Sequence, residues 1–170
     1  MSMTLLSGGA RSGKSSLAVH RAASGEPVVF IATGEAGDEE MAARIETHRA
    51  ERPPGWTTVE EPVEIRAALE ASSAEAFVIL DCLSLWVSNL MGRDWDDDAI
   101  ETEAARLARA ASSRRAPTVV VTNEVGLGIV PTTPLGRRYR DVLGRVNAGF
   151  AETADETLFV VAGRALRLER

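Results

Sequence analysis

The stretch from Gly8 to Ser15 constrains the fold of this chain more than any other, because it matches the phosphate-binding pattern G-x-x-x-x-G-K-[ST] at every fixed position. The apolar run 3–7 before it predicts a buried strand, and the run from residue 14 to about residue 23 predicts a helix. Between a strand and a helix, the N–H groups of a glycine-rich loop can bind phosphate oxygens. Lys14 is then expected to reach the β- and γ-phosphates, and Ser15 to bind Mg²⁺. The stretch therefore predicts a nucleoside triphosphate site rather than a glycine-rich turn with a chance lysine.

Composition limits the class of protein. With 170 residues, of which 45% are hydrophobic, we expect a single domain spanning residues 1–170. The formal net charge of −6 disfavours a nucleic-acid partner bound by a broad basic surface. Cys82 is the only cysteine, which excludes a disulfide framework and a cysteine zinc site. The chain has no apolar run long enough to span a membrane and no signal-peptide pattern, so we expect a cytoplasmic protein.

Strand and helix patterns alternate along the chain. Buried strands are predicted at 3–7, 28–32, 77–81, 118–122 and 157–161, with a possible short strand at 57–59. Helices are predicted at 14–23, 39–50, 62–72, 83–91, 99–115 and 135–153, and a short tail follows the last strand. This alternation predicts an α/β fold with a mostly parallel sheet and helices on both faces.

Asp81 ends an apolar strand, which is where a P-loop enzyme places its second metal-holding carboxylate. We expect Asp81 and Ser15 to hold Mg²⁺ together; the alternative is a turn aspartate without a ligand. Cys82 follows, where many P-loop motor ATPases have a water-activating glutamate, and this difference favours group transfer over hydrolysis. Cys82 itself is interpreted as a small buried side chain.

His48 allows two interpretations. It shares one face of the helix 39–50 with Met41 and Ile45, so it can be a helix-end histidine that packs near Ile45, and spacing alone favours this interpretation. Alternatively, its imidazole can attack a phosphorus atom and form a phosphoramidate, because a histidine with the ordinary pKa of about 6.5 is mostly neutral at physiological pH. The other histidine, His20, is expected at the surface, and the acidic run 94–98 is expected to be a solvated loop.

Further blocks accompany the phosphate-binding stretch, in order along the chain. They are 31–33, 40–45, His48-Arg49, Arg52-Pro53, 81–83, Asn89-Leu90, 122–131, Arg140-Asp141 and 144–147. Together they resemble the adenosylcobinamide kinase/adenosylcobinamide-phosphate guanylyltransferase family of cobalamin assembly. The resemblance covers nearly the whole chain, and the block 122–131 is far more specific than the phosphate-binding stretch alone.

The resemblance implies two activities. The family phosphorylates adenosylcobinamide with ATP or GTP, and then transfers GMP from GTP to the new phosphate, which gives adenosylcobinamide-GDP and pyrophosphate. It uses a guanylyl-histidine intermediate, and the histidine in the matching block is His48, which reverses the interpretation from spacing. The family is similar in fold to RecA-type P-loop proteins and forms trimers with active sites between subunits.

The resemblance also implies a set of site residues. The catalytic residues would be His48 and Lys14, and Ser15 and Asp81 would hold the metal. The nucleotide contacts would be Gly8, Gly9, Ala10, Arg11, Ser12, Gly13, Lys14, Ser15, Glu35, Ala36, Gly37, Arg52, Pro53, Pro54, Gly55, one of Glu60 and Glu61, and Asp81. The loop 123–131 and the region of Trp86 and Trp95 are candidate corrinoid contacts.

Two other functions remain possible from the sequence. One is a kinase that keeps only the first activity. The other is a P-loop regulatory module that binds nucleotide and transfers nothing. His48 and the loop 123–131 argue against the regulatory module, because a simple nucleotide switch needs neither.

Overall fold

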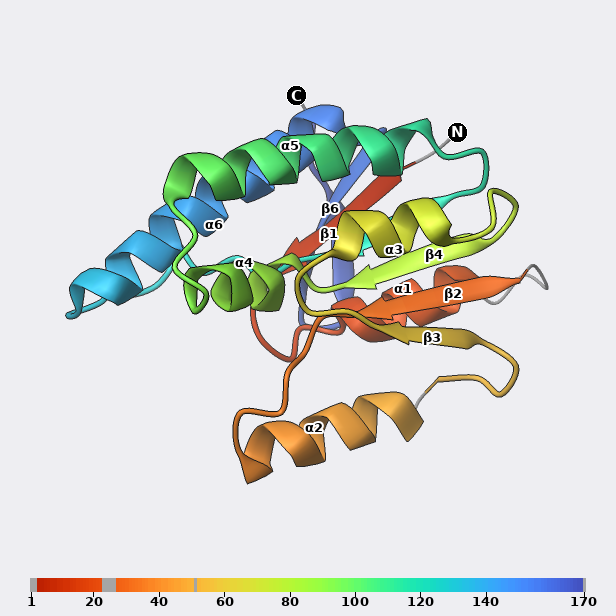
Figure 1. The fold of residues 1–170 in the computed structure, drawn as a ribbon, viewed down its shortest axis with the longest axis horizontal. Helices are drawn as coiled ribbons and strands as arrows, with labels where there is room; N and C mark the ends of the chain where they lie inside the picture. Colours follow the sequence, from red (N-terminus) through yellow and green to blue (C-terminus); the bar gives the residue numbers. More distant parts are fainter. Residues whose placement is uncertain (1–2, 23–26, 51, 170) are drawn as a thin grey trace.

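A computed structural model describes residues 3–22, 27–50 and 52–169. Seven strands form one sheet in the order β3-β2-β4-β5-β1-β6-β7 (Figure 1). The strands are β1 Met3–Gly8, β2 Val28–Ala32, β3 Thr57–Glu60, β4 Phe77–Asp81, β5 Thr118–Val121, β6 Glu156–Val161 and β7 Arg164–Arg167. Neighbouring strands are parallel except β6 and β7, which are antiparallel. The carboxyl ends of the parallel strands therefore meet at one edge, where ligands of open α/β sheets bind.

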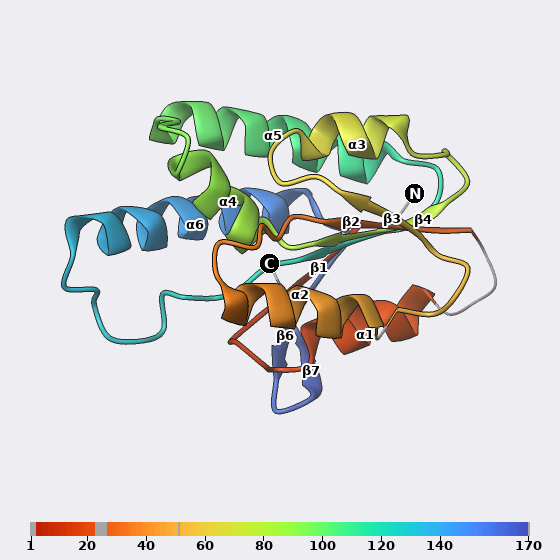
Figure 2. The same cartoon turned by 60° about the horizontal axis from the view of Figure 1, so that its bottom comes forward.

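Helices cover both faces of the sheet, as the sequence predicts. They are α1 Lys14–Ala22, α2 Glu39–Ala50, α3 Ile65–Ala71, α4 Leu83–Met91, α5 Asp97–Ser113 and α6 Pro134–Thr153. Figure 2 shows α3, α4, α5 and α6 on one side of the sheet and α1 on the other. Figure 1 shows α2 set apart from the sheet, beyond the edge strand β3. No helix in the described ranges is long and apolar enough to cross a membrane.

The two faces of the sheet belong to two cores, because successive side chains of a strand point to opposite faces. In β1, Leu5 packs into the core beneath α3 to α6, whereas the adjacent Leu6 packs into the core beneath α1. In β4, Leu80 and Ile79 divide in the same way. Strands buried on both faces are continuous apolar runs in sequence, which is why these strands were predictable.

Two helix boundaries differ from the predictions because of side-chain caps. The first turn of the helix predicted at 62–72 is missing, since the Glu61 carboxylate accepts hydrogen bonds from the N–H groups of Val63 (3.0 Å) and Glu64 (2.9 Å) and holds a turn there. The helix predicted at 99–115 begins earlier, because Asp96 accepts a hydrogen bond from the Ala99 N–H at 2.7 Å and acts as its N-cap.

The prediction of a tail after the fifth buried strand is wrong, because this segment forms β7. Ala162 (φ 49°) and Gly163 (φ 71°) connect β6 to β7 in a two-residue hairpin that requires positive φ at both positions. All four side chains of β7 are exposed. The strand has no buried face, so its sequence lacks the apolar pattern from which strands are predicted.

Arg114 ends α5 and ties it to the segment between α3 and β4. Its guanidinium donates to the carbonyl oxygens of Leu69 (3.2 Å), Ser73 (2.7 Å) and Ala76 (2.9 Å). These carbonyls lie at and beyond the end of α3, and those of Leu69 and Ser73 also accept backbone N–H groups, from Ser72 (3.2 Å) and Ala76 (3.1 Å). Arg114 therefore adds a charged donor to the carbonyls at this end of the helix.

We expect Arg114→Ala to lower the free energy of unfolding by about 2–3 kcal/mol, because it leaves several partly buried carbonyls without a charged donor. Urea unfolding measures this loss. Arg115→Ala is the matched control: the Arg115 side chain is 80% exposed and pairs only with Glu75 among described residues. The control should change stability by less than about 1 kcal/mol. Equal losses in the two variants would contradict the role of Arg114.

Candidate active site

The loop between β1 and α1 can form only with glycine at its two fixed positions. A Cβ atom at Gly8 would lie 2.2 Å from the Val160 carbonyl oxygen of the neighbouring strand. Gly13 has a φ of 101°, which side chains rarely adopt. Its carbonyl then accepts the first helical hydrogen bond of α1, from the Leu17 N–H at 3.0 Å. The two glycines of the pattern thus allow the tight turn from strand to helix.

Lys14, the only lysine in the chain, is buried inside this loop. Its ammonium donates to the carbonyl oxygens of Gly8 (3.0 Å) and Gly9 (2.6 Å), and to the Ser12 hydroxyl (3.3 Å). Burial lowers the pKa of Lys14, and the nearby Asp81 carboxylate opposes this shift. The loop thus holds a cation in the position that phosphate binding requires.

Ser15 and Asp81 meet across the sheet edge, from α1 and the end of β4. The Ser15 hydroxyl donates to Asp81 Oδ2 at 2.8 Å. Burial raises the pKa of Asp81, while the Ser15 hydrogen bond and the charges of His48 and Lys14 oppose this shift. A hydroxyl and a carboxylate are hard oxygen donors of the kind that Mg²⁺ prefers. Among the described residues, no group of three or more acidic, histidine or cysteine side chains is placed to hold a metal ion.

A cavity of about 510 Å³ joins the phosphate-binding loop to α2. Its wall includes residues 10–16 of the loop, Asp81, and the α2 face formed by Met41, Ile45 and His48. His48 is exposed, yet close enough to Asp81 for its charge to lower the Asp81 pKa. The structure therefore brings the predicted cradle and the predicted nucleophile into one cavity, which sequence spacing could not show.

Arg52 lines this cavity from the segment between α2 and β3. Its guanidinium lies over the Phe30 ring, 4.0 Å from the centroid, and donates to the Thr58 hydroxyl at 3.2 Å. Burial lowers the pKa of Arg52. A cation fixed over an aromatic ring lies on the wall facing the phosphate loop. The neighbouring Pro53, Pro54 and Gly55, also predicted contacts, are not part of the cavity wall.

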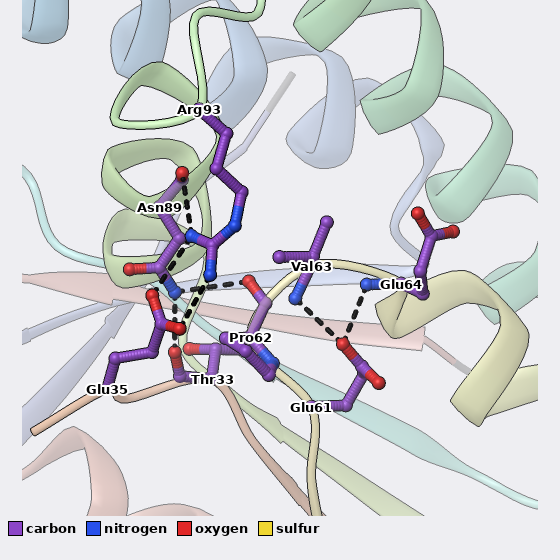
Figure 3. Close-up of polar contacts among 8 residues, drawn as sticks. All are labelled: Thr33, Glu35, Glu61, Pro62, Val63, Glu64, Asn89 and Arg93. Carbon is purple, nitrogen blue, oxygen red and sulfur yellow. Dashed lines mark hydrogen bonds and ion pairs between the residues drawn. The ribbon is translucent and has the colours of Figure 1, made fainter.

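The structure distinguishes between the two adjacent glutamates. Glu60 lines the cavity and forms an ion pair with Arg49 of α2. Glu61 instead caps the turn before α3 (Figure 3). Glu60 is therefore the one placed to face a nucleotide.

The predicted contacts Glu35, Ala36 and Gly37 do not line the cavity. The Glu35 carboxylate instead pairs with the guanidinium of Arg93, in the turn after α4 (Figure 3). Gly8 and Gly9 are likewise absent from the cavity wall, because their carbonyls hold Lys14. The remaining predicted contacts, Ala10 to Ser15, lie on the wall.

Several cavity residues were not predicted as contacts. They are Ser16, Phe30, Ala32, Gly34, Met41, Ile45, Cys82, Leu85 and Val121, whereas Asn123, which also lines the cavity, belongs to the loop predicted as a corrinoid contact. The shared helix face with His48 was the available signal for Met41 and Ile45. Cys82 is buried, as predicted, and burial raises its pKa to about 11, so the thiol stays protonated at neutral pH.

The segment after β5 is tied to the site by Asn123 and Glu124. The Asn123 amide donates to the Ser84 hydroxyl at 2.8 Å, and the Asn123 carbonyl accepts from Asn147 at 3.0 Å. The Glu124 N–H donates to the Gly8 carbonyl at 3.0 Å. Farther along, Leu127, Ile129 and Val130 are exposed. The loop is thus fixed at the cavity and presents apolar side chains outside it.

The prediction that Trp86 contacts the corrinoid is wrong. Its side chain is fully buried beneath α5 and α6, and its indole N–H donates to the Val63 carbonyl at 2.8 Å. Trp95 is partly buried and packs against the same core. Within the acidic run, Asp96 caps α5 and Asp97 pairs with Arg138, which gives these carboxylates structural roles.

The fold and the cradle define a P-loop nucleotide-binding protein of the α/β class. The family described as cobinamide kinase / cobinamide phosphate guanyltransferase matches residues 4–168. The chain belongs to this family.

Curated relatives resemble the chain over nearly its whole length. A bifunctional adenosylcobalamin biosynthesis protein CobP of Pseudomonas aeruginosa is 44% identical, with 97% of this chain and 96% of the relative covered. Bifunctional adenosylcobalamin biosynthesis proteins CobU of Escherichia coli and Salmonella typhimurium are 41% and 38% identical, with 98% of this chain and 99% of each relative covered.

The burial of Asp81 predicts a pH-dependent stability difference. Its pKa is raised above the usual 3.8, so the folded protein binds this proton more readily than the unfolded chain. The contribution of Asp81 to stability is thus present at low pH and is lost as pH rises through the folded-state pKa. Asp81→Asn keeps an acceptor for Ser15 without the charge, so it should gain stability relative to wild type as pH rises from about 4 towards neutral.

Urea unfolding across this pH range measures the difference. Asp98→Asn, at an exposed position of α5, is the control and should show no comparable trend. A stability difference for Asp81→Asn that shrinks as pH rises would contradict the assignment.

Proposed function

We propose that this chain phosphorylates adenosylcobinamide with ATP or GTP and then transfers GMP from GTP to the new phosphate, giving adenosylcobinamide-GDP and pyrophosphate. The observation that carries the proposal is the shared cavity, because the phosphate-binding loop and His48, the proposed nucleophile, both line it. Membership of the family and the bifunctional relatives support the same conclusion. They disfavour the regulatory module and the kinase-only alternative.

In the kinase step, the substrate hydroxyl attacks the γ-phosphorus and the bond to the β-phosphate oxygen breaks. The substrate must lie in line with this bond. Lys14 and the N–H groups of the loop stabilise the charge that develops on the phosphate oxygens. These groups are fixed before the reaction by the short loop between β1 and α1.

In the guanylyl transfer, a neutral imidazole nitrogen of His48 attacks the α-phosphorus. The P–N bond forms and the bond to pyrophosphate breaks, so pyrophosphate leaves into the cradle around Lys14. An oxygen of the substrate phosphate then attacks the same phosphorus, and the P–N bond breaks to release His48. This half-reaction is therefore ping-pong.

Mg²⁺ is the metal that the donor set fits. Ser15 and Asp81 would hold it through their side-chain oxygens, which lie 2.8 Å apart. It would supply positive charge to the phosphates and to leaving pyrophosphate. The raised pKa of Asp81 means that protons compete with the metal more strongly than at an ordinary aspartate.

We also propose a cytoplasmic homotrimer with active sites in clefts between subunits. Resemblance to the family is the basis for the assembly. The exposed apolar side chains of Leu127, Ile129, Val130 and Leu135 are consistent with it, since such a group commonly marks an interaction surface. The same loop remains the candidate corrinoid contact.

We expect His48→Ala to abolish covalent labelling of the protein by GTP labelled in the α-phosphate, while kinase activity remains detectable. The reason is that only the guanylyl transfer requires the imidazole. Mass spectrometry of the protein after incubation with GTP and Mg²⁺ measures the added GMP. His20→Ala is the matched control, because His20 is the other histidine and is exposed on α1. Undiminished labelling of His48→Ala would remove this residue from the role.

We expect Lys14→Ala to lower both activities by about a hundredfold or more, because both reactions use the same phosphate cradle. Phosphorylation of adenosylcobinamide and release of pyrophosphate measure the two activities. Because Lys14 is the only lysine, amine-selective acetylation can modify only this side chain and the N-terminal amine. GTP should protect Lys14 against it. Near-normal turnover of either reaction in the variant would contradict a shared cradle.

A further inference from the structure

The helix that carries His48 is not held by the core. None of the α2 side chains that the structure describes is buried. Ile45 packs near Gly34, where an added Cβ would lie 3.4 Å from the Ile45 side chain, and Arg49 pairs with Glu60. The direction of α2 therefore depends strongly on the segment that leads into it from β2.

Two side chains hold this leading segment, which spans residues 33–38: Asn89 of α4, and Arg93 in the turn that follows α4 (Figure 3). The two terminal nitrogens of the Arg93 guanidinium donate to the two oxygens of the Glu35 carboxylate, at 2.6 Å (Nη2 to Oε1) and 3.0 Å (Nη1 to Oε2). Arg93 Nη1 also donates to the Asn89 carbonyl at 3.1 Å, so its side chain is fixed at two places. The hydrogen bond from Arg93 lowers the pKa of Glu35, which keeps this carboxylate ionised.

Asn89 holds the segment through its backbone. Its amide group donates to the Thr33 carbonyl at 2.8 Å and to the Pro62 carbonyl at 3.1 Å (Figure 3). These carbonyls follow β2 and β3. One side chain of α4 therefore joins the loops at the ends of two strands. An amide nitrogen with two hydrogens is the group that can make both bonds.

The link from Glu35 to α2 is short and hydrogen-bonded. The Gly37 N–H donates to the Glu35 carbonyl at 3.0 Å. The Asp38 carboxylate then accepts from the Met41 N–H at 2.7 Å, which caps the first turn of α2. A displacement of Glu35 is thus transmitted to the start of the helix.

We infer that Asn89 of α4 and Arg93 of the turn after α4 form a clamp that positions His48 for guanylyl transfer, with Glu35 as the grip of the clamp rather than a nucleotide contact. This inference rests on the proposed function. Asn89 and Arg93 are positioning residues, because neither lines the cavity. Glu35 is predicted as a nucleotide contact by family resemblance alone, and the clamp gives it a different role.

The lever arm of α2 makes the position of His48 sensitive to the clamp. His48 lies nine residues beyond Glu39, where the helix begins, which corresponds to about 14 Å along the helix axis. A tilt of about five degrees then moves the imidazole by roughly 1 Å. A displacement of this size can lower a rate by about a hundredfold. Lys14, Ser15 and Asp81 are on other elements and would keep their places.

Arg93→Ala tests the clamp by separating the two reactions. We expect the rate of labelling by α-labelled GTP to fall roughly ten- to a hundredfold, while the rate of adenosylcobinamide phosphorylation changes by less than about twofold. Arg66→Ala is the matched control, since Arg66 on α3 also bonds two carboxylates, Glu70 (3.0 Å) and Glu103 (2.6 Å), away from the cavity. Unchanged labelling in Arg93→Ala, or equal losses of both activities, would overturn the inference.

Exchanging the charges tests the role of Glu35. The double variant Glu35→Arg/Arg93→Glu reforms an ion pair, so it should recover at least about tenfold of the labelling rate lost in Glu35→Arg. If Glu35 instead contacts the nucleotide directly, the double variant should not recover the labelling rate. That result would overturn the role of Glu35 in the clamp.

Amide hydrogen exchange tests the clamp independently of any measurement of enzyme activity. Peptides covering 39–50 should exchange faster in Arg93→Ala than in wild type, while peptides covering α1 are unchanged. Unchanged exchange in α2 would overturn the clamp. Absence of GMP labelling in the wild-type protein, with faster exchange in the variant, would instead refute the proposed guanylyl transfer and leave the clamp supported.

Discussion

The parallel pairing of β5 with β1 on one side and β4 on the other is the constraint on which the site depends. Because the three strands run in one direction, the loop after β1, Asp81 at the end of β4 and Asn123 after β5 all lie at the same edge of the sheet. The 2.8 Å bond between Ser15 and Asp81 closes this arrangement across β5. Each strand is buried on both faces, so hydrophobic burial fixes the spacing of the polar groups at its end.

The site contains buried charges that folding alone does not favour. Burial shifts the pKa of Lys14 downwards and that of Asp81 upwards, so in each case the charged form is penalised. The two groups offset each other only in part. In the proposed function, the phosphates of a nucleotide and a divalent cation would supply the missing partners. Binding of the nucleotide would then offset the electrostatic cost in the protein, which is the usual relation between stability and function at such sites.

The sequence was sufficient for the elements that are strongly patterned. The loop 8–15 has two glycines whose positions are required by backbone geometry, so its pattern is nearly equivalent to its structure. β7 has no apolar face, and it was missed for that reason. Spacing alone placed His48 on the same face as Met41 and Ile45, but not in the same cavity as Lys14, because this depends on how α2 is oriented against the sheet. The sequence could not show which of Glu60 and Glu61 faces the site, because the two acids are adjacent. In the structure, Glu60 lines the cavity and Glu61 caps a turn.

The position of α2 outside the core suits a protein that carries out two different reactions. Attack at the γ- and α-phosphorus of a nucleotide requires different groups at different distances from a fixed cradle. A nucleophile on a core helix would be held in a single place, whereas one on a peripheral helix can be positioned by a few polar bonds. Asn89 and Arg93 supply such bonds at the start of α2, and Glu60 supplies one near its end through Arg49. Exposed ion pairs are individually weak, so small changes at either end can shift the helix without unfolding it. In the proposed mechanism, the rigid cradle would serve both reactions, whereas the lightly held helix would serve the guanylyl transfer.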